Sequence, residues 1–98
     1  MRESPEIPNV ELEKERELIQ LVKRGSHKAY TELITKYQKK IFKLAYGFFG
    51  NRDDAMEIVQ ETFLRLFEKM DKFDDRTNFK NWVYRIAYNL QYIGIGKA

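Results

Sequence analysis

Apolar residues recur along this 98-residue chain at intervals of three and four, the spacing that places them on one face of a helix. The first helix is predicted from about Val10 to Arg24, with Gly25 as its C-terminal stop. Ser26 is a suitable cap for a second helix that continues to about Phe49. The expected core stripe of this second helix is Tyr30, Leu33, Ile34, Tyr37, Ile41, Leu44, Ala45 and Phe48.

The second half of the chain predicts two further helices and no strand. Asn51 caps the third helix, after which residues 71–77 are polar and turn-forming. The fourth helix starts near Thr77 or Asn78 and ends near Ile93. The third helix has the clearest stripe, made of Ala55, Ile58, Val59, Thr62, Phe63, Leu66, Phe67 and Met70. One apolar stripe per helix and short connections predict an all-α fold, a compact bundle of about four helices.

Residues 78–89 (NFKNWVYRIAYN) combine a buried stripe with a face of cations, rings and amides. The stripe is Phe79, Trp82, Val83, Ile86 and Leu90. The other face carries Lys80, Tyr84 and Tyr88 in one row, with Asn81, Arg85 and Asn89 in the next. Such a face suits single-stranded nucleic acid, because rings stack on bases, cations follow phosphates and amides read base edges. The alternative is that Tyr84, Tyr88 and Tyr92 form a half-buried rim of the core.

Charge alternates along the chain although the net charge is only +3. Residues 26–50 carry five basic and one acidic side chain, and residues 51–75 carry four basic and eight acidic ones. No acidic residue follows Asp75, which favours a nucleic-acid partner for the fourth helix because a carboxylate repels phosphate. The alternation predicts two different partners. The lysines of the second helix either extend the basic surface or only solubilise it.

Composition excludes several classes of protein. With 43% hydrophobic residues, the chain is too apolar to be disordered, and the absence of cysteine excludes disulfides and thiolate metal sites. No apolar run is long enough to cross a membrane, and the first fifteen residues lack the apolar core of a signal peptide. A lone His27 provides neither a metal cluster nor a catalytic pair. We therefore expect no enzyme and no cofactor.

Two apolar residues lie outside the core stripes. Leu64 shares an outward face with Glu57, Gln60, Glu61 and Glu68. This face is either solvated or a docking surface for a basic protein partner, and spacing alone favours the solvated face. Phe73 interrupts the polar loop, where it either tucks under the loop or forms the wall of a pocket against the fourth helix.

The run DDAMEIVQETFLRLFEKMDKF (Asp53–Phe73), followed by NFKNWVYRIAYN, resembles region 2 of bacterial sigma factors, most of all the extracytoplasmic-function group. Residues 25–46 are similar to the opening helices of that family. The resemblance implies a non-enzymatic domain that binds core RNA polymerase through the clamp helices of its largest subunit. It also implies recognition of the minus-ten promoter element as a melted, non-template single strand with a flipped base. An anti-sigma factor as a further partner, and a bacterial, cytoplasmic, nucleoid-associated location without membrane contact, follow from the same resemblance.

The resemblance also implies roles for individual residues. It assigns polymerase binding to the outward face of the third helix, and so reverses the preference for a solvated face there; the residues are Glu57, Gln60, Glu61 and Leu64. Phe73 and Ile86 would form apolar walls around the flipped base, and Asn89 would read it. The rim of this pocket would be Asp74, Asp75, Arg76, Thr77 and Asn78. Lys80, Tyr84 and Arg85 would hold the strand with support from Tyr88, while Trp82 matches a position near strand separation but suits a core role equally.

Two departures from the family pattern shape the expected organisation. The helix-turn-helix domain that reads the minus-thirty-five element is absent, so we expect an excised domain. The sequence ends as QYIGIGKA instead of a longer basic helix. We expect a flexible N-terminus over residues 1–9, the region 2-like domain over 10–93, and an altered or truncated tail over 94–98. The alternatives are a helical adaptor that docks a protein through its acidic third helix, and a helical regulator that binds duplex DNA.

Overall fold

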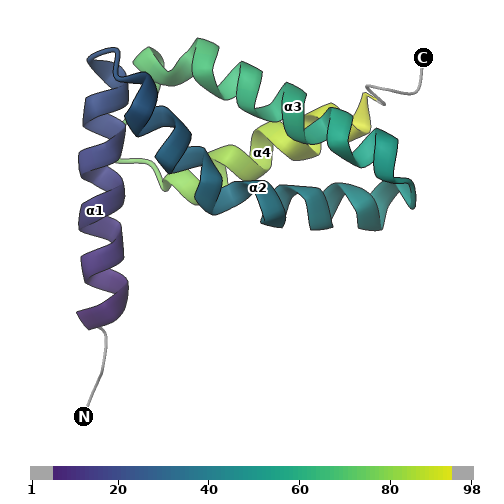
Figure 1. The fold of residues 1–98 in the computed structure, drawn as a ribbon, viewed down its shortest axis with the longest axis horizontal. Helices are drawn as coiled ribbons and strands as arrows, with labels where there is room; N and C mark the ends of the chain where they lie inside the picture. The colour runs from purple at the N-terminus through teal and green to yellow at the C-terminus, as the bar shows by residue number, and fades with distance from the viewer. Residues whose placement is uncertain (1–5, 94–98) are drawn as a thin grey trace. The chain divides into compact units, whose positions relative to one another are not determined.

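The computed structural model describes residues 6–93, and side chains from residue 10 onward. The expected tail and most of the expected flexible N-terminus therefore lie outside the described residues. Four α-helices and one 3-10 turn follow each other along the chain (Figure 1). They are α1 (Glu6–Lys23), α2 (His27–Phe49), α3 (Arg52–Lys69), η1 (Met70–Lys72) and α4 (Phe79–Tyr92). The predicted all-α class is confirmed, and residues 6–93 contain no strand.

The chain divides into two compact units, residues 1–33 and residues 34–98. The first contains α1 and the beginning of α2. The second contains the rest of α2 together with α3, η1 and α4, and it holds every residue to which the sequence assigns a binding role. None of the helices within residues 6–93 has both the length and the apolar character needed to cross a bilayer.

Local hydrogen bonds end and begin the helices where the sequence predicts. Gly25, at a φ of 99°, donates its N–H to the Val22 carbonyl at 2.8 Å, and Ser26 donates to the Leu21 carbonyl at 3.0 Å. This pair of bonds is the Schellman arrangement, and its left-handed residue favours glycine. The Ser26 hydroxyl then accepts the Ala29 N–H at 3.0 Å, which caps α2.

The boundary between α2 and α3 depends on a second glycine and a second cap. Gly50 has a φ of 68° and follows the last residue of α2. The Asn51 side chain accepts the Asp54 N–H at 3.0 Å, and Asp53 and Asp54 lie in the first turn of α3. Carboxylates in this position interact favourably with the positive end of the helix dipole.

The first helix begins earlier than the sequence suggests. We expected its start near Val10, whereas α1 begins at Glu6 and includes Pro8. Proline is tolerated there because the first four N–H groups of a helix have no partner within the helix.

The core of the second unit lies where α3 packs against α4. Ile41 and Ala45 of α2 are fully buried in this unit. The edge of the Phe79 ring meets Tyr37 of α2, with ring centroids 5.7 Å apart. The least exposed side chains of the two packed helices are Ala55, Ile58, Thr62, Leu66, Val83, Ala87 and Leu90. Three helices therefore contribute to one small core.

Two aromatic residues that we expected in the core are exposed. Phe48 is 55% exposed and Phe67 is 44% exposed. Phe67 directly follows the buried Leu66, and each residue of a helix turns the side chain by about 100°. This rotation places Phe67 outside the arc of α3 that α4 covers. Phe48 lies in the last turn of α2.

Two leucines on α3 allow a matched test of this packing. Leu66→Ala should lower the free energy of unfolding by about 2–5 kcal/mol, because Leu66 is fully buried and its removal leaves a cavity. Leu64→Ala should change it by less than about 0.5 kcal/mol, because Leu64 is 52% exposed. Urea denaturation followed by circular dichroism measures both values. Equal destabilisation by the two variants would contradict the assigned faces of α3.

Candidate functional site

Three aromatic rings form a cluster where the loop after η1 meets the first turn of α4. Phe73 lies edge-on to Phe79, with centroids 5.3 Å apart and the planes at 90°. It also packs on Trp82, with centroids 4.7 Å apart, and Phe79 and Trp82 are 6.0 Å apart. Phe73 is only 5% exposed, and its N–H donates to the Met70 carbonyl at 3.1 Å. Phe73 therefore lies buried under the loop.

Residues 74–77 form a turn that is stabilised by one carboxylate. Asp74 accepts hydrogen bonds from the Arg76 backbone N–H at 2.9 Å, from Nε at 3.1 Å and from Nη2 at 2.9 Å. The Thr77 N–H donates to the Asp74 carbonyl at 2.8 Å. The hydrogen bonds that the Arg76 guanidinium donates to the Asp74 carboxylate raise the pKa of that guanidinium. The loop arginine, whose side chain is 90% exposed, is thus paired within its own loop.

Asn78 ends the loop and starts the helix. Its side-chain oxygen accepts the Asn81 N–H at 3.0 Å, and its carbonyl accepts the Trp82 N–H at 3.1 Å. The five residues of the expected rim, 74–78, are all exposed. They connect two anchored points, the buried Phe73 ring and the capped start of α4.

One edge of α4 changes from apolar to polar along its length. Trp82, Ile86 and Asn89 follow each other at spacings of four and three, so they share this edge. Trp82 is half-buried against Phe73, Ile86 is 9% exposed, and Asn89 is exposed. The two expected walls of the base pocket, Phe73 and Ile86, are therefore both buried. Asn89 lies at the open end of the edge.

The tyrosines of α4 become more exposed toward the end of the helix. Tyr84 is half-buried, Tyr88 is 46% exposed and Tyr92 is 84% exposed. Tyr84 thus fits the rim of a core, whereas Tyr92 extends into solvent. The neighbouring polar side chains Lys80, Asn81 and Arg85 are exposed.

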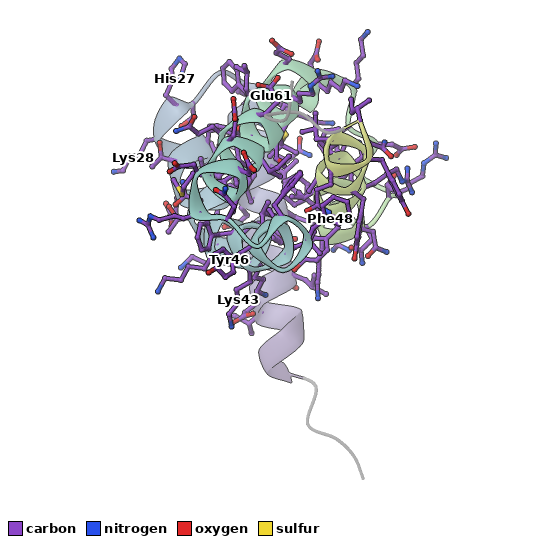
Figure 2. All side chains as sticks on the ribbon, turned by 90° about the vertical axis from the view of Figure 1, so that its right-hand side faces the viewer. His27, Lys28, Lys43, Tyr46, Phe48 and Glu61 are labelled. Carbon is purple, nitrogen blue, oxygen red and sulfur yellow. The ribbon has the colours of Figure 1, made fainter. Side chains whose placement is uncertain are left out.

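The outward face of α3 carries the other set of predicted residues. Glu57 and Gln60 are exposed, and Leu64 is 52% exposed. Glu61 is half-buried and forms an ion pair with Arg65, at 3.4 Å between Oε2 and Nε. Figure 2 shows Glu61 on α3 and Tyr46 on α2 projecting from different sides of the unit. The four predicted residues thus share one helix and one surface.

Two further apolar residues on the same stripe of α3 as Leu64 are exposed, although the periodicity did not predict them as surface residues. Met56 is 38% exposed and Phe67 is 44% exposed. The spacing signal was present, because Met56, Gln60, Leu64 and Phe67 follow each other at four, four and three residues, one stripe of a helix. We call Met56, Leu64 and Phe67 the α3 apolar patch. It gives the acidic face a hydrophobic centre.

The site has no metal-binding arrangement within the described part of the chain. Over the described residues, no three acidic or histidine side chains are grouped in a way that could hold a metal ion. The exposed rings, amides and charged side chains at these surfaces can stack, form hydrogen bonds and pair with charges.

Comparisons with known proteins identify relatives of the chain. Residues 33–93 match the family described as Sigma-70 region 2. The chain is 40% identical over 72 residues to the ECF RNA polymerase sigma factor SigW of Bacillus subtilis (strain 168), an alignment that covers 74% of this chain and 38% of that protein. It is 34% identical over 77 residues to the RNA polymerase sigma-H factor of Pseudomonas aeruginosa, covering 79% and 40%. The chain thus spans about two fifths of the length of these curated relatives.

A solved structure shares the fold. The NMR structure of an engineered region 2 of sigmaE in complex with GTAAAA superposes with a TM-score of 0.71 at 33% sequence identity. The match covers 76% of this chain and 78% of that one.

The Asp74 turn predicts a specific pattern of amide exchange. Asp74→Ala should speed hydrogen exchange of the Arg76 amide by about fivefold, because that N–H loses its acceptor and a typical net hydrogen bond contributes about 1 kcal/mol. Asp74→Asn should have a smaller effect, since an amide oxygen can still accept the bond. NMR exchange spectroscopy measures both rates. Unchanged exchange in Asp74→Ala would show that the carboxylate does not stabilise the turn.

Proposed function

The chain belongs to the sigma-70 region 2 family, with relatives of the extracytoplasmic-function type, and we propose that it acts as a non-enzymatic transcription initiation module. In this role it binds core RNA polymerase and recognises the minus-ten promoter element as a melted, non-template single strand. The observation that carries the proposal is the junction of loop and α4, where the buried Phe73 packs on the half-buried Trp82, beside an edge of the helix that ends in the exposed amide of Asn89. The related engineered region 2 of sigmaE, which has the same overall fold, forms a complex with GTAAAA.

A flipped base would enter between the loop and α4. Flipping costs a few kcal/mol, which stacking and hydrogen bonding in the pocket must offset. Phe73 and Ile86 are buried in the unbound chain, so the base gains access to their surfaces only when the loop moves outward. Exposed hydrogen bonds between Asp74 and Arg76 hold the rim, and bonds of this kind oppose the movement only weakly. Asn89 then supplies the donor and acceptor that read the base edge.

The remaining strand lies along the exposed face of α4. Lys80 and Arg85 are exposed and positioned to neutralise phosphates. Tyr88 offers an exposed ring for stacking, and the half-buried Tyr84 supports it one turn earlier. Trp82 is held against Phe73 and so places its indole at the start of this path.

Polymerase binding belongs to the outward face of α3. Leu64 provides an apolar anchor, and we add Met56 and Phe67 to the surface because they are exposed on the same stripe of α3. Glu57 and Glu61 complement the basic side chains that we expect on the clamp helices of the largest polymerase subunit. An anti-sigma factor that covers either surface would block initiation, and the place of action is the bacterial cytoplasm at the nucleoid.

Two other functions fit parts of the surface. A helical adaptor would use only the acidic face and apolar patch of α3, with the tyrosines of α4 as structural residues. A duplex-binding regulator would use the basic residues of α4 without strand preference. Rings and amides on one exposed face favour the single-stranded role.

Strand preference tests the proposed function directly. The chain should bind the single-stranded hexamer d(GTAAAA) about tenfold more tightly than its complement d(TTTTAC), because each base read by paired hydrogen bonds contributes about 1–3 kcal/mol of discrimination. Fluorescence anisotropy at low salt measures both affinities. Equal affinity, or no binding to either strand, would remove the support for promoter recognition.

Two substitutions separate the two surfaces. Asn89→Ala should reduce the preference for d(GTAAAA) about fivefold while polymerase association stays unchanged, and Asn81→Ala is the matched control with an exposed amide on the same helix. Leu64→Glu should weaken association with core polymerase about tenfold or more while strand preference stays intact, because a charge replaces the apolar anchor. Pull-down with core polymerase and anisotropy measure the two activities. Loss of both activities in a variant with native circular dichroism would contradict separate surfaces.

A further inference from the structure

A strip of alternating cations and rings runs along the solvent side of α2, and neither proposed surface includes it. Lys39, Phe42, Lys43 and Tyr46 are spaced at i, i+3, i+4 and i+7, so they share one face of the helix. We call these four residues the α2 strip. Lys39 and Lys43 are exposed, Tyr46 is 49% exposed and Phe42 is half-buried. Figure 2 shows Lys43 and Tyr46 on the same side of α2.

The rings of the strip are already arranged as a stack. Phe42 and Tyr46 lie nearly parallel, with centroids 5.9 Å apart and planes at 18°. The guanidinium of Arg52, at the start of α3, lies 5.9 Å from the centre of the Phe42 ring. Arg52, Phe42 and Tyr46 thus form a series that ends in a half-exposed tyrosine. A ring fixed in this way can accept another planar group at a small entropic cost.

The core does not require this arrangement. The buried positions of α2 within the second unit are Tyr37, Ile41 and Ala45, and Tyr37 contacts Phe79 of α4. Lys39 and Tyr46 lie on a different side of the helix from these residues, since each residue turns the helix by about 100°. The strip is therefore separate from the loop and α4 site.

The charge around the strip favours a polyanion. Residues 33–52 contain five basic side chains and no acidic one. Two of these lysines alternate with the two rings inside the strip, and Arg52 borders it. Lysines alone would attract any anionic partner, including an acidic protein segment. The parallel rings select for a ligand that combines phosphates with flat bases.

We propose that the α2 strip is a second binding site for single-stranded nucleic acid, on which a base stacks against Tyr46 while Lys39 and Lys43 neutralise the adjoining phosphates. Because stacking and phosphate contacts carry no base pattern, this site binds without sequence preference. It is independent of minus-ten recognition and holds whether or not the loop and α4 read a promoter. In a long strand the two sites together increase the apparent affinity.

The homopolymer dT20 tests the strip without a promoter sequence. Tyr46→Ala should weaken binding of dT20 about tenfold, since stacking contributes about 1–3 kcal/mol per base, whereas Tyr46→Phe should bind as the unmodified chain does. Lys43→Ala should reduce the slope of log affinity against log salt by about 0.7, the effect of one lost phosphate contact. Lys28→Ala, an exposed lysine of α2 outside the strip, is the matched control and should leave affinity within about twofold.

The outcomes separate this proposal from its alternatives. Unchanged dT20 binding in Tyr46→Ala, or equal losses in Lys28→Ala and Lys43→Ala, would overturn it. Competition by poly-glutamate that is as effective as dT20 and insensitive to Tyr46→Ala would instead identify a site for an acidic protein. Circular dichroism checks the fold of each variant. The double variant Lys39→Ala, Lys43→Ala tests the strip by changing exposed side chains alone. The preference for d(GTAAAA) over d(TTTTAC) is measured in Tyr46→Ala as well and should stay intact, so failure of promoter recognition and failure of the strip give different results.

Discussion

The contact of Phe73 with the rings of Phe79 and Trp82 determines the geometry of the whole candidate site. It holds the end of η1 against the first turn of α4, and Tyr37 continues the same ring packing into α2. The exposed loop 74–78 therefore spans only the short distance between a buried ring and a helix cap. The two ends of this short loop are therefore fixed in position. The ring cluster thus belongs to the core and also fixes the position of the loop.

The loop between these two anchors is exposed. Its internal bonds join Asp74 to Arg76 and Thr77, and the side chains involved are exposed. Exposed ion pairs contribute at most about 1 kcal/mol, so the turn has a defined shape at rest and can still be displaced. A buried anchor beside an exposed turn fits the proposed entry of a base. Loops that bind ligands are commonly among the less stable parts of a protein for this reason.

The surfaces of the second unit differ in charge. The outward face of α3 is acidic around an apolar patch, whereas α4 and the solvent side of α2 carry lysines, an arginine and exposed rings. A nucleic acid attracted to the basic helices is repelled by α3, which leaves that face available to a protein. Aromatic residues follow the same division, since Tyr37 and Phe79 complete the core while Tyr46 and Tyr92 meet solvent. The same residue type thus serves packing or binding according to the arc of the helix on which it lies.

Sequence by itself determined the all-α class, three of the helix starts and the family resemblance. Ser26, Asn51 and Asn78 cap their helices through bonds that reach only three residues along the chain, so the local sequence contains all the information they need. The residue roles inferred from the resemblance, including that of Asn89, stay predictions. Only the tertiary structure decided the burial of Phe73 and the exposure of Phe48 and Phe67. Burial depends on which arc of a helix a neighbouring element covers. Periodicity along one helix does not contain this information, because the neighbouring elements meet only after the chain has folded.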